Sequence, residues 1–406
     1  MIKQKNYENL LNDEEQYSFK SHKELEEYLS FRNENDILIS CSINELSAYG
    51  LENLPLFIEE QAKNIMASRD GFKIPCEPLD LDNIKVQECI NDIGLFLIVP
   101  YENKYEPMPI SVSAYASILG RADDYSNLMA RLEPKSAKKV LPITEKAVRI
   151  TRDFELNSEN CLILIRDGKV RAAHSRVFCW LDNEILINEL EKYLETEHSD
   201  YTWISGIVNE NFLISEYQLN NTLMEESLRF QLNENGADVH ELSTSIQFIT
   251  SDTGDSAVWV NLVYKIDSTR VVIKGINIEH KGEASEEKFI ESLKSFAKVL
   301  EESEAKIEEL GNTDIKNVPE TYKKIIMRFS SVFPEKVSKE VYDELRINFP
   351  NGGTAMDVFL ALNDTITRHL KSSNASVERT LLMTDQIAKM INLPFDKIDN
   401  ELVDWD

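Results

Sequence analysis

Residues 249–256, ITSDTGDS, place two carboxylates and a glycine directly after an apolar segment. Asp-Thr-Gly after a strand is the arrangement that an aspartic protease uses, and Asp-x-Gly also opens some phosphate-binding loops. A protease needs two such loops, because two carboxylates must share a proton, and the sequence has one copy. Asp255 would place an extra negative charge beside Asp252. This charge would also repel a phosphate, unless a divalent cation bridged the carboxylates and the phosphate.

The simpler alternative is a tight turn between two strands, in which Asp252, Gly254 and Asp255 supply the turn geometry. We favour this turn and expect both carboxylates to lie in solvent. In the metal alternative, Asp252 and Asp255 hold a divalent ion in an enzyme that acts on a nucleotide. The common nucleotide-binding and hydrolase motifs do not occur in the sequence, so we favour a binding protein over an enzyme and expect no cofactor.

The histidines and cysteines do not have the spacing of a metal site. His174 and His280 lie in strand-like segments, but no third ligand is placed to converge with them, which favours a structural role. The five cysteines lie far apart and form no C-x-x-C pair. Cys161 and Cys179 occur in apolar segments, so we expect both to be buried free thiols.

A basic segment interrupts the otherwise acidic chain at residues 131–152 and continues into the next hairpin. Such a strip could bind a single nucleic-acid strand, with Phe178 and Trp180 stacking on bases. It could equally pair with acidic helices elsewhere in the fold. For the nucleic-acid alternative, we expect the phosphate contacts to be Lys138, Lys139, Arg149, Arg152 and Arg176.

The overall charge favours a protein partner. The chain of 406 residues has 71 acidic and 44 basic side chains and a formal net charge of -27. This charge repels nucleic acid and suits docking onto a basic protein surface. The N-terminus lacks the core of a signal peptide, and the longest apolar run, residues 94–100, is too short to span a membrane. We therefore expect a cytoplasmic protein without a membrane partner.

Hydrophobic periodicity and turn residues predict an α+β fold. Residues 1–105 alternate helical and strand patterns, including a helix after Ser21 and another at 54–70, and residues 100–109 resemble a boundary loop. Hairpins at 160–180 and 200–220 and a strand pair at 245–275 should form one antiparallel sheet with helices on one face. The predicted domains are an N-terminal α/β region (1–105), a central α+β core (106–315) and a helical C-terminal region (316–406).

Two helices of the central region have clear end signals. Asp182 is a predicted N-cap, and Ile185, Leu186, Leu190 and Leu194 form an apolar stripe behind it. A second amphipathic helix should run without interruption from Ser285 to Leu310. The Asp-Gly pair at 167–168 predicts a two-residue hairpin turn.

The stretch KVRAAHSRVFCWLDNEILINELEKYL (169–194) resembles the "R-A-x-x-S-x-x-Y, then D-N-x-x-L" signature of a family of uncharacterised phage- and plasmid-encoded proteins, the domain of unknown function 932. TSDTGDS resembles a later N-S-x-x-G loop of that family, and IEHKG (278–282) resembles its following R/E-H-x-G. With similar helical segments on both sides, the resemblance covers residues 110–370 in the same order. The sequence departs from the pattern at Phe178 and at Asp252.

The resemblance implies a mobile-element protein that acts inside a bacterial cell by binding, either neutralising a host defence complex or modulating DNA transactions. Among the positions that it groups, Arg171 and Lys281 could supply cations and Asp252 and Asp255 carboxylates to one polar cluster in a cleft beside the sheet. The alternative for this cluster is a buried polar network that fixes hairpin geometry. The candidate positions are Arg171, Ser175, Asp182, Asn183, Asp252, Gly254, Asp255, His280 and Lys281.

Overall fold

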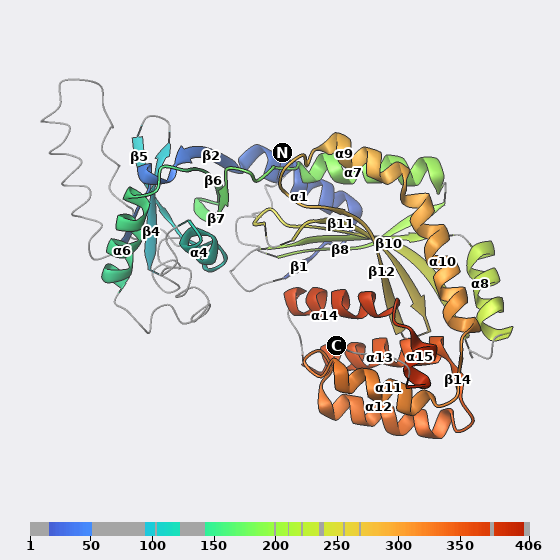
Figure 1. The fold of residues 1–406 in the computed structure, drawn as a ribbon. Helices are drawn as coiled ribbons and strands as arrows, with labels where there is room; N and C mark the ends of the chain where they lie inside the picture. The colour runs from blue at the N-terminus through green and yellow to red at the C-terminus, as the bar shows by residue number, and fades with distance from the viewer. Residues whose placement is uncertain are drawn as a thin grey trace, which may run out of the picture.

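The computed structural model describes residues 16–50, 94–101, 104–121, 143–198, 200–209, 211–220, 222–234, 239–254, 256–267, 269–373 and 377–401. Within these residues the fold is α+β with antiparallel sheets, which confirms the predicted class (Figure 1). The expected helix at 54–70 lies outside the described residues. No helix of the described part is long and apolar enough to cross a membrane.

The largest sheet has six antiparallel strands in the order β1-β8-β9-β10-β11-β12. The predicted hairpin at 200–220 and the strand pair at 245–275 both lie in it. Side chains that alternate along each strand cover both faces with buried apolar groups, and Tyr217, Phe248 and Tyr264 are among the largest. The strands are β1 (Tyr17–Ser18), β8 (Tyr201–Val208), β9 (Leu213–Leu219), β10 (Leu242–Thr250), β11 (Val258–Ile266) and β12 (Thr269–Ile278).

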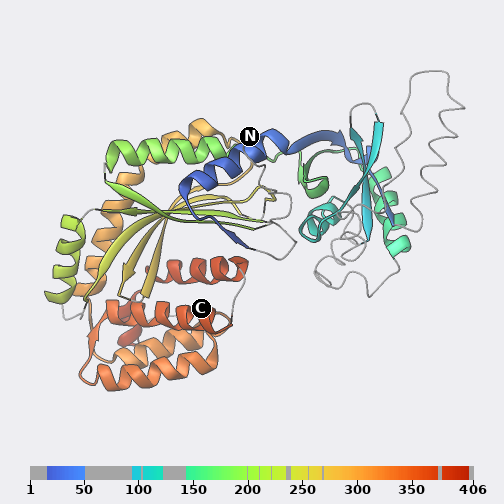
Figure 2. The ribbon, with the colours of Figure 1, turned by 180° about the vertical axis from the view of Figure 1, so that it is seen from behind.

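Helices lie on both sides of this sheet (Figures 1 and 2). On one side are α1 (His22–Asn35), α7 (Asn183–Glu197) and α9 (Glu286–Lys294), and α8 (Thr222–Glu234) and α10 (Phe296–Asn312) follow at the end of the sheet. On the other side, the helical C-terminal region packs on β12 and shares the same hydrophobic core. Its helices are α11 (Val318–Arg328), α12 (Glu335–Asn348), α13 (Ala355–Ser373), α14 (Val377–Met390) and α15 (Phe395–Asp399), with the short pair β13 (Asp314–Ile315) and β14 (Gly353–Thr354) between them.

Local sequence signals explain where several helices begin. Asp182 caps α7 as predicted, because its carboxylate accepts hydrogen bonds from the backbone N–H groups of Glu184 and Ile185. Ser21 and Ser285 cap α1 and α9 in the same manner. The predicted apolar stripe of α7 is wrong at Ile185, which is 39% exposed, while its neighbour Ile187 is buried.

The expected continuous helix from Ser285 to Leu310 is wrong, because it breaks into α9 and α10 at Ser295. The hydroxyl of Ser295 donates to the carbonyl of Ser292, and its backbone N–H bonds within the last turn of α9. A serine that bonds locally to the backbone competes with helix continuation. Apolar side chains of both helices, such as Phe289 on α9 and Ile307 on α10, are buried in the core.

The hairpin at 160–180 does not join the large sheet, which corrects the expected arrangement. Strands β6 (Asn160–Arg166) and β7 (Lys169–Ser175) pair instead with β2 (Ile37–Ser42) in a separate sheet of order β2-β6-β7. The turn between them uses Asp167 and Gly168 with positive φ angles of 54° and 73°, as the Asp-Gly pair predicts.

A third sheet of order β3-β4-β5 lies beside this hairpin, with β3 at Ser47–Gly50 and β4 at Leu95–Tyr101. The loop predicted at 100–109 is wrong, because Lys104–Pro109 forms the edge strand β5 against β4. Proline is compatible with an edge strand, which has one unpaired side. Helices α4 (Val112–Leu119) and α6 (Ile143–Glu155) pack with this sheet and the hairpin.

The buried apolar side chains form two separate clusters. One contains residues between 39 and 173, and the other contains residues 19–29 together with residues between 181 and 398. The chain therefore passes between the two clusters near Asp36 and again between Ser175 and Leu181. The three-domain division at 105 and 315 stays a prediction.

Candidate functional site

Three segments from distant parts of the sequence meet where the two clusters adjoin. The first follows β7, the second is the turn at 251–254, and the third is the loop at 279–282. The backbone N–H of Cys179 donates to the carbonyl of His280 at 2.9 Å, and Phe178 and Lys281 form a β-bridge. The segments that carry the family resemblance are therefore neighbours in space.

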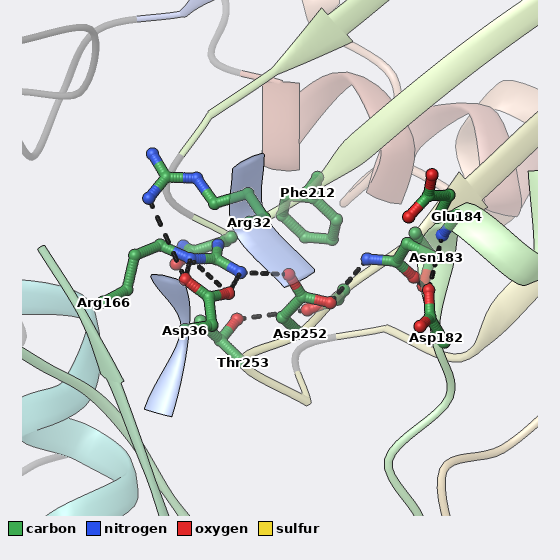
Figure 3. Close-up of polar contacts among 12 residues, drawn as sticks. Arg32, Asp36, Arg166, Asp182, Asn183, Glu184, Phe212, Asp252 and Thr253 are labelled. Atoms are coloured by element: carbon green, nitrogen blue, oxygen red, sulfur yellow. Dashed lines mark hydrogen bonds and ion pairs between the residues drawn. The ribbon is translucent and has the colours of Figure 1, made fainter. Parts of the chain in front are cut away.

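Asp252 lies at the centre of this meeting point (Figure 3). Its Oδ2 accepts a hydrogen bond from Nη2 of Arg166 at 2.5 Å, and its Oδ1 accepts one from Nδ2 of Asn183 at 2.6 Å. The side chain is 14% exposed, so the expectation of a carboxylate in solvent is wrong for Asp252. The turn faces β6 of the other cluster, which the sequence pattern around the turn does not reveal. Gly254 does adopt the expected turn geometry, with φ of 81°, whereas Asp255 lies outside the described residues.

Arg166 joins Asp252 to Asp36, the residue between α1 and β2. Nε of Arg166 donates to both carboxylate oxygens of Asp36 at 3.0 Å, and Nη2 also contacts Asp36. Burial opposes the charge of Arg166, but the two carboxylates raise the pKa of its guanidinium well above the usual value. Burial also raises the pKa of Asp36, and Arg166 partly opposes this rise.

A second buried arginine extends the network. Arg32, on α1, is 4% exposed, and its Nη1 donates to both oxygens of Asp167 at 3.0 Å. Its guanidinium also lies 5.0 Å from the centre of the Tyr28 ring, a cation–π contact. Two arginines and three aspartates thus connect α1, the β6–β7 hairpin and the 251–254 turn, and these contacts hold the two clusters against each other.

Beside the network, three rings stack in parallel. The rings of His174 and Phe178 have centroids 3.6 Å apart, and the rings of Phe178 and His280 stack with centroids 5.1 Å apart. Burial lowers the pKa of His174 to about 4 and also lowers the pKa of His280, so both imidazoles are neutral near pH 7. Nδ1 of His280 lies 3.1 Å from the carbonyl of Cys179. A Cβ on Gly254 would lie 3.4 Å from the His174 ring, so glycine permits this close approach.

The three stacked rings argue against the nucleic-acid alternative, in which Phe178 would stack on a base. Two imidazoles already stack on Phe178, which leaves less room for a base on this ring. Arg152 and Arg176 are exposed, Arg149 is half-buried, and Lys138 and Lys139 lie outside the described residues. The other basic side chains of this region in the described part are buried, namely Lys146, Arg166, Lys169 and Arg171.

The remaining candidate positions divide into two groups. Asn183, Asp252, Gly254 and His280 lie together. Ser175, which is half-buried at the end of β7, and the N-cap Asp182 lie beside them. Asp182 also accepts a hydrogen bond from Asn33 at 3.0 Å. The expected cations differ: Arg171 is buried on β7, and Lys281 is exposed and pairs with Glu279 at 2.5 Å.

Arg32 and Asp36 were not among the residues expected at the site, and Arg166 was not assigned to it. A signal existed, because Arg166 precedes the Asp-Gly turn at the end of an apolar strand, and a charge there needs a buried partner. The sequence does not indicate which carboxylate provides it.

The described residues contain one group with metal-ligand geometry, and it lies away from this network. His22, Glu26 and Glu191 have ligand atoms within 4.8 Å of one another. In the structure they contact one another: Nε2 of His22 contacts Glu191, and Nδ1 lies 3.8 Å from Glu26. The phenolic hydroxyl of Tyr217 also donates to Glu191 at 2.8 Å, so these contacts explain the group without an ion.

A small cavity of about 20 Å³ opens between the network and the β8–β9 turn. Arginine, asparagine and aspartate side chains line it together with the aromatic side chains of Tyr28, Trp180 and Phe212. No family model matches the chain, and no curated protein or solved structure matches it. The chemistry of the site therefore rests on its own geometry, which provides charged hydrogen bonds within the network and one polar cavity beside it.

Proposed function

We propose that the chain is an acidic accessory protein of a phage or plasmid, which acts in the bacterial cytoplasm by binding a basic surface of another protein. The family resemblance at residues 110–370 supports the mobile-element context. The net charge of -27 supports a basic partner, because opposite potentials steer association. A basic component of a host defence complex, or of the machinery for DNA transactions, has the required chemistry.

One observation carries this proposal: four exposed glutamates on α9 and α10 have no ion-pair partner among the described residues. Glu287 and Glu291 are one turn apart on α9, and Glu301 and Glu308 are two turns apart on α10. Nearby acidic side chains such as Glu302 and Glu309 are neutralised by lysines on the same helix. We call the four unpaired residues the acidic row.

The geometry of the polar network supports binding over catalysis at Asp252. Arg166 and Asn183 each donate a hydrogen bond to one oxygen of Asp252, so both oxygens already have partners within a structural network. The nucleic-acid alternative has less support than protein binding, because two imidazoles already stack on Phe178.

A charge-reversal experiment tests the proposal. The tagged protein is used to capture partners from host cells, in parallel with a variant in which Glu287, Glu291, Glu301 and Glu308 are changed to lysine. The control changes the same number of exposed carboxylates on α12 and α15, namely Glu335, Glu340, Asp343 and Asp396. We expect the parent and the control to retain a basic partner that rising salt releases, and the acidic-row variant to lose it.

The same purified parent is then titrated with single-stranded DNA at physiological salt. We expect no tight binding. Tight DNA binding, or equal partner capture by the acidic-row variant, would contradict the proposal.

A further inference from the structure

Two cysteines lie opposite each other inside the cluster of buried side chains between residues 39 and 173. Cys41 on β2 and Cys161 on β6 are direct partners in the antiparallel pair, and their sulfur atoms lie 3.7 Å apart. Cys41 is 6% exposed, Cys161 is 2% exposed, and both are free thiols. One thiol donates a hydrogen bond to the other sulfur, so the two side chains are in contact without a covalent bond.

The backbone at this pair has the separation that a disulfide requires. Residues directly opposite in an antiparallel pair have Cα atoms about 4.5 or 5.5 Å apart, depending on their place in the hydrogen-bond pattern. A disulfide joins Cα atoms about 4.4–6.8 Å apart, so either place is suitable. The sulfur atoms must approach from 3.7 Å to about 2.05 Å, and rotation of the two side chains supplies this movement.

The surroundings of the pair favour Cys161 as the reacting thiolate. The hydrogen bond from Cys41 lowers the pKa of Cys161, and the positive charge of Arg121 lowers it further, whereas burial and Glu45 oppose both effects. The same hydrogen bond and burial raise the pKa of Cys41, so this thiol keeps its proton. Arg121 follows α4, and its Nε is buried without a hydrogen-bond partner among the described residues. A nearby cation and a second thiol are typical of redox-active cysteines.

The pair lies close to one end of the β2–β6 ladder. The next and last partners in the ladder are Ser42 and Asn160, and Asn160 is exposed. The ends of strands open locally at a low cost in free energy, which gives a small oxidant access to the thiols without unfolding of the cluster.

We propose that Cys41 and Cys161 form a reversible cross-strand disulfide when the protein reacts with a peroxide. The thiolate of Cys161 attacks one oxygen of hydrogen peroxide, so that an S–O bond forms, the O–O bond breaks and the departing hydroxide takes up a proton to become water. The sulfur of Cys41 then attacks the sulfenic acid at Cys161. The S–S bond forms, the S–O bond breaks, and the thiol proton of Cys41 leaves with the hydroxide as water. The two thiols lose two electrons, and the peroxide gains them.

The disulfide would restrain the whole cluster. Residues 41 and 161 are 120 positions apart, and most of the buried residues of the cluster lie between them. A cross-link that closes such a long loop restricts the unfolded chain, so the oxidised protein should resist unfolding. It also joins β2, which directly follows Asp36, to β6, which ends at Arg166. This inference goes beyond the proposed partner binding and does not depend on the acidic row.

Oxidation of the purified full chain tests the proposal. The protein is reduced with dithiothreitol, freed of the reductant and treated with a small excess of hydrogen peroxide, and its peptides are mapped by mass spectrometry without reduction. We expect one cross-linked pair of peptides that contains Cys41 and Cys161, and dithiothreitol should separate it. The melting temperature of the oxidised protein should exceed that of the reduced protein by at least about 5 °C.

Matched alanine variants assign the effect to this pair. Cys41→Ala and Cys161→Ala should each abolish the cross-link and the peroxide-dependent rise in melting temperature. Cys179→Ala is the control and should behave as the parent does. Cys179 is half-buried, which corrects the buried position expected from the sequence, and its sulfur contacts the backbone carbonyls of Val177 and Gly282. If neither variant of the pair folds, the peptide map of the parent decides the question.

Three results would overturn the proposal. The first is that both thiols of the parent remain open to alkylation after peroxide treatment and denaturation. The second is oxidation of Cys161 to a sulfinic acid without a cross-link, or a cross-link from either cysteine of the pair to another cysteine of the chain. The third is a Cys41–Cys161 cross-link that leaves the melting temperature unchanged, which would contradict the restraint of the cluster. None of these results affects partner capture through the acidic row.

Discussion

Two regions of the molecule use carboxylates in opposite ways. At the junction of the clusters, Asp36 and Asp252 are buried and share Arg166. On the acidic row, Glu287, Glu291, Glu301 and Glu308 are exposed and have no ion-pair partner among the described residues. Burial makes a charge depend on its partner, whereas an exposed charge is solvated and stays available to another molecule.

The buried carboxylates should therefore affect the stability of this protein, and the exposed carboxylates should affect its binding. Loss of one member of the junction network leaves a buried charge without compensation, so the free energy of unfolding should fall. Loss of charge on the acidic row should leave the fold intact and change what the protein binds. The variants below test each side of this comparison.

The largest effect is expected for Arg166→Met. The substitution removes the cation that Asp36 and Asp252 share, and breaking a buried pair from one side costs about 3–5 kcal/mol. Denaturant unfolding should show this loss, while Arg176→Met, at an exposed arginine, should change stability by less than about 0.5 kcal/mol. Equal midpoints for the two variants would show that the network does not stabilise the junction.

The next effect concerns the pH dependence of stability through His174. Its folded pKa of about 4 lies below the unfolded value of about 6.5, so the unfolded chain takes up the proton first as pH falls. The stabilisation from the neutral imidazole is complete above pH 6.5 and is lost progressively towards pH 4. The lowered pKa corresponds to a loss of about 3 kcal/mol over this range.

Melting temperatures of the parent and of His174→Gln between pH 7 and pH 4.5 check this expectation. The parent should lose more stability than the variant as the solution is acidified. Parallel curves for the two proteins would mean that His174 titrates normally in the folded state.

A smaller loss is expected for Asp252→Asn. The amide keeps the shape of the side chain but removes one of the two carboxylates that face Arg166, which should cost about 1–3 kcal/mol. The matched control is Glu287→Gln on the acidic row, for which we expect no measurable change in melting temperature. An unchanged melting temperature for Asp252→Asn would indicate that Asp252 lies in a solvated turn, as its sequence indicates.

The smallest effect on stability is expected for the fourfold lysine variant of the acidic row. All four side chains are exposed, so the melting temperature should stay within about 2 °C of the parent. Circular dichroism should show the same helix content. A large drop in melting temperature would mean that these glutamates stabilise α9 and α10 and that loss of binding could not be assigned to charge.

The fold class and the local features, such as helix caps and turns, were predicted well from the sequence. The N-cap at Asp182, the Asp-Gly turn at 167–168 and the strands around the ITSDTGDS segment all follow from short-range chemistry. The errors concern choices that depend on distant partners. The hairpin at 160–180 pairs with β2 instead of the large sheet, and an alternating strand pattern does not specify its neighbour.

The candidate site was predicted in part for the same reason. The family resemblance grouped Asn183, Asp252, Gly254 and His280, and these residues lie together in the structure. Arg171 and Lys281 were expected to supply the cations of this cluster, but the cation that contacts Asp252 is Arg166. Arg32 and Asp36 lie more than 120 positions from their partners across the junction, and single-sequence spacing carries no information about such pairs.

Partner capture by two variants in parallel tests the central claim most directly. Asp252→Asn alters the junction, and the fourfold lysine variant alters the acidic row, so each changes one side of the comparison. At a temperature where both variants are folded, we predict that Asp252→Asn retains the salt-sensitive basic partner and that the acidic-row variant loses it. Loss of the partner by Asp252→Asn together with full retention by the acidic-row variant would contradict the account.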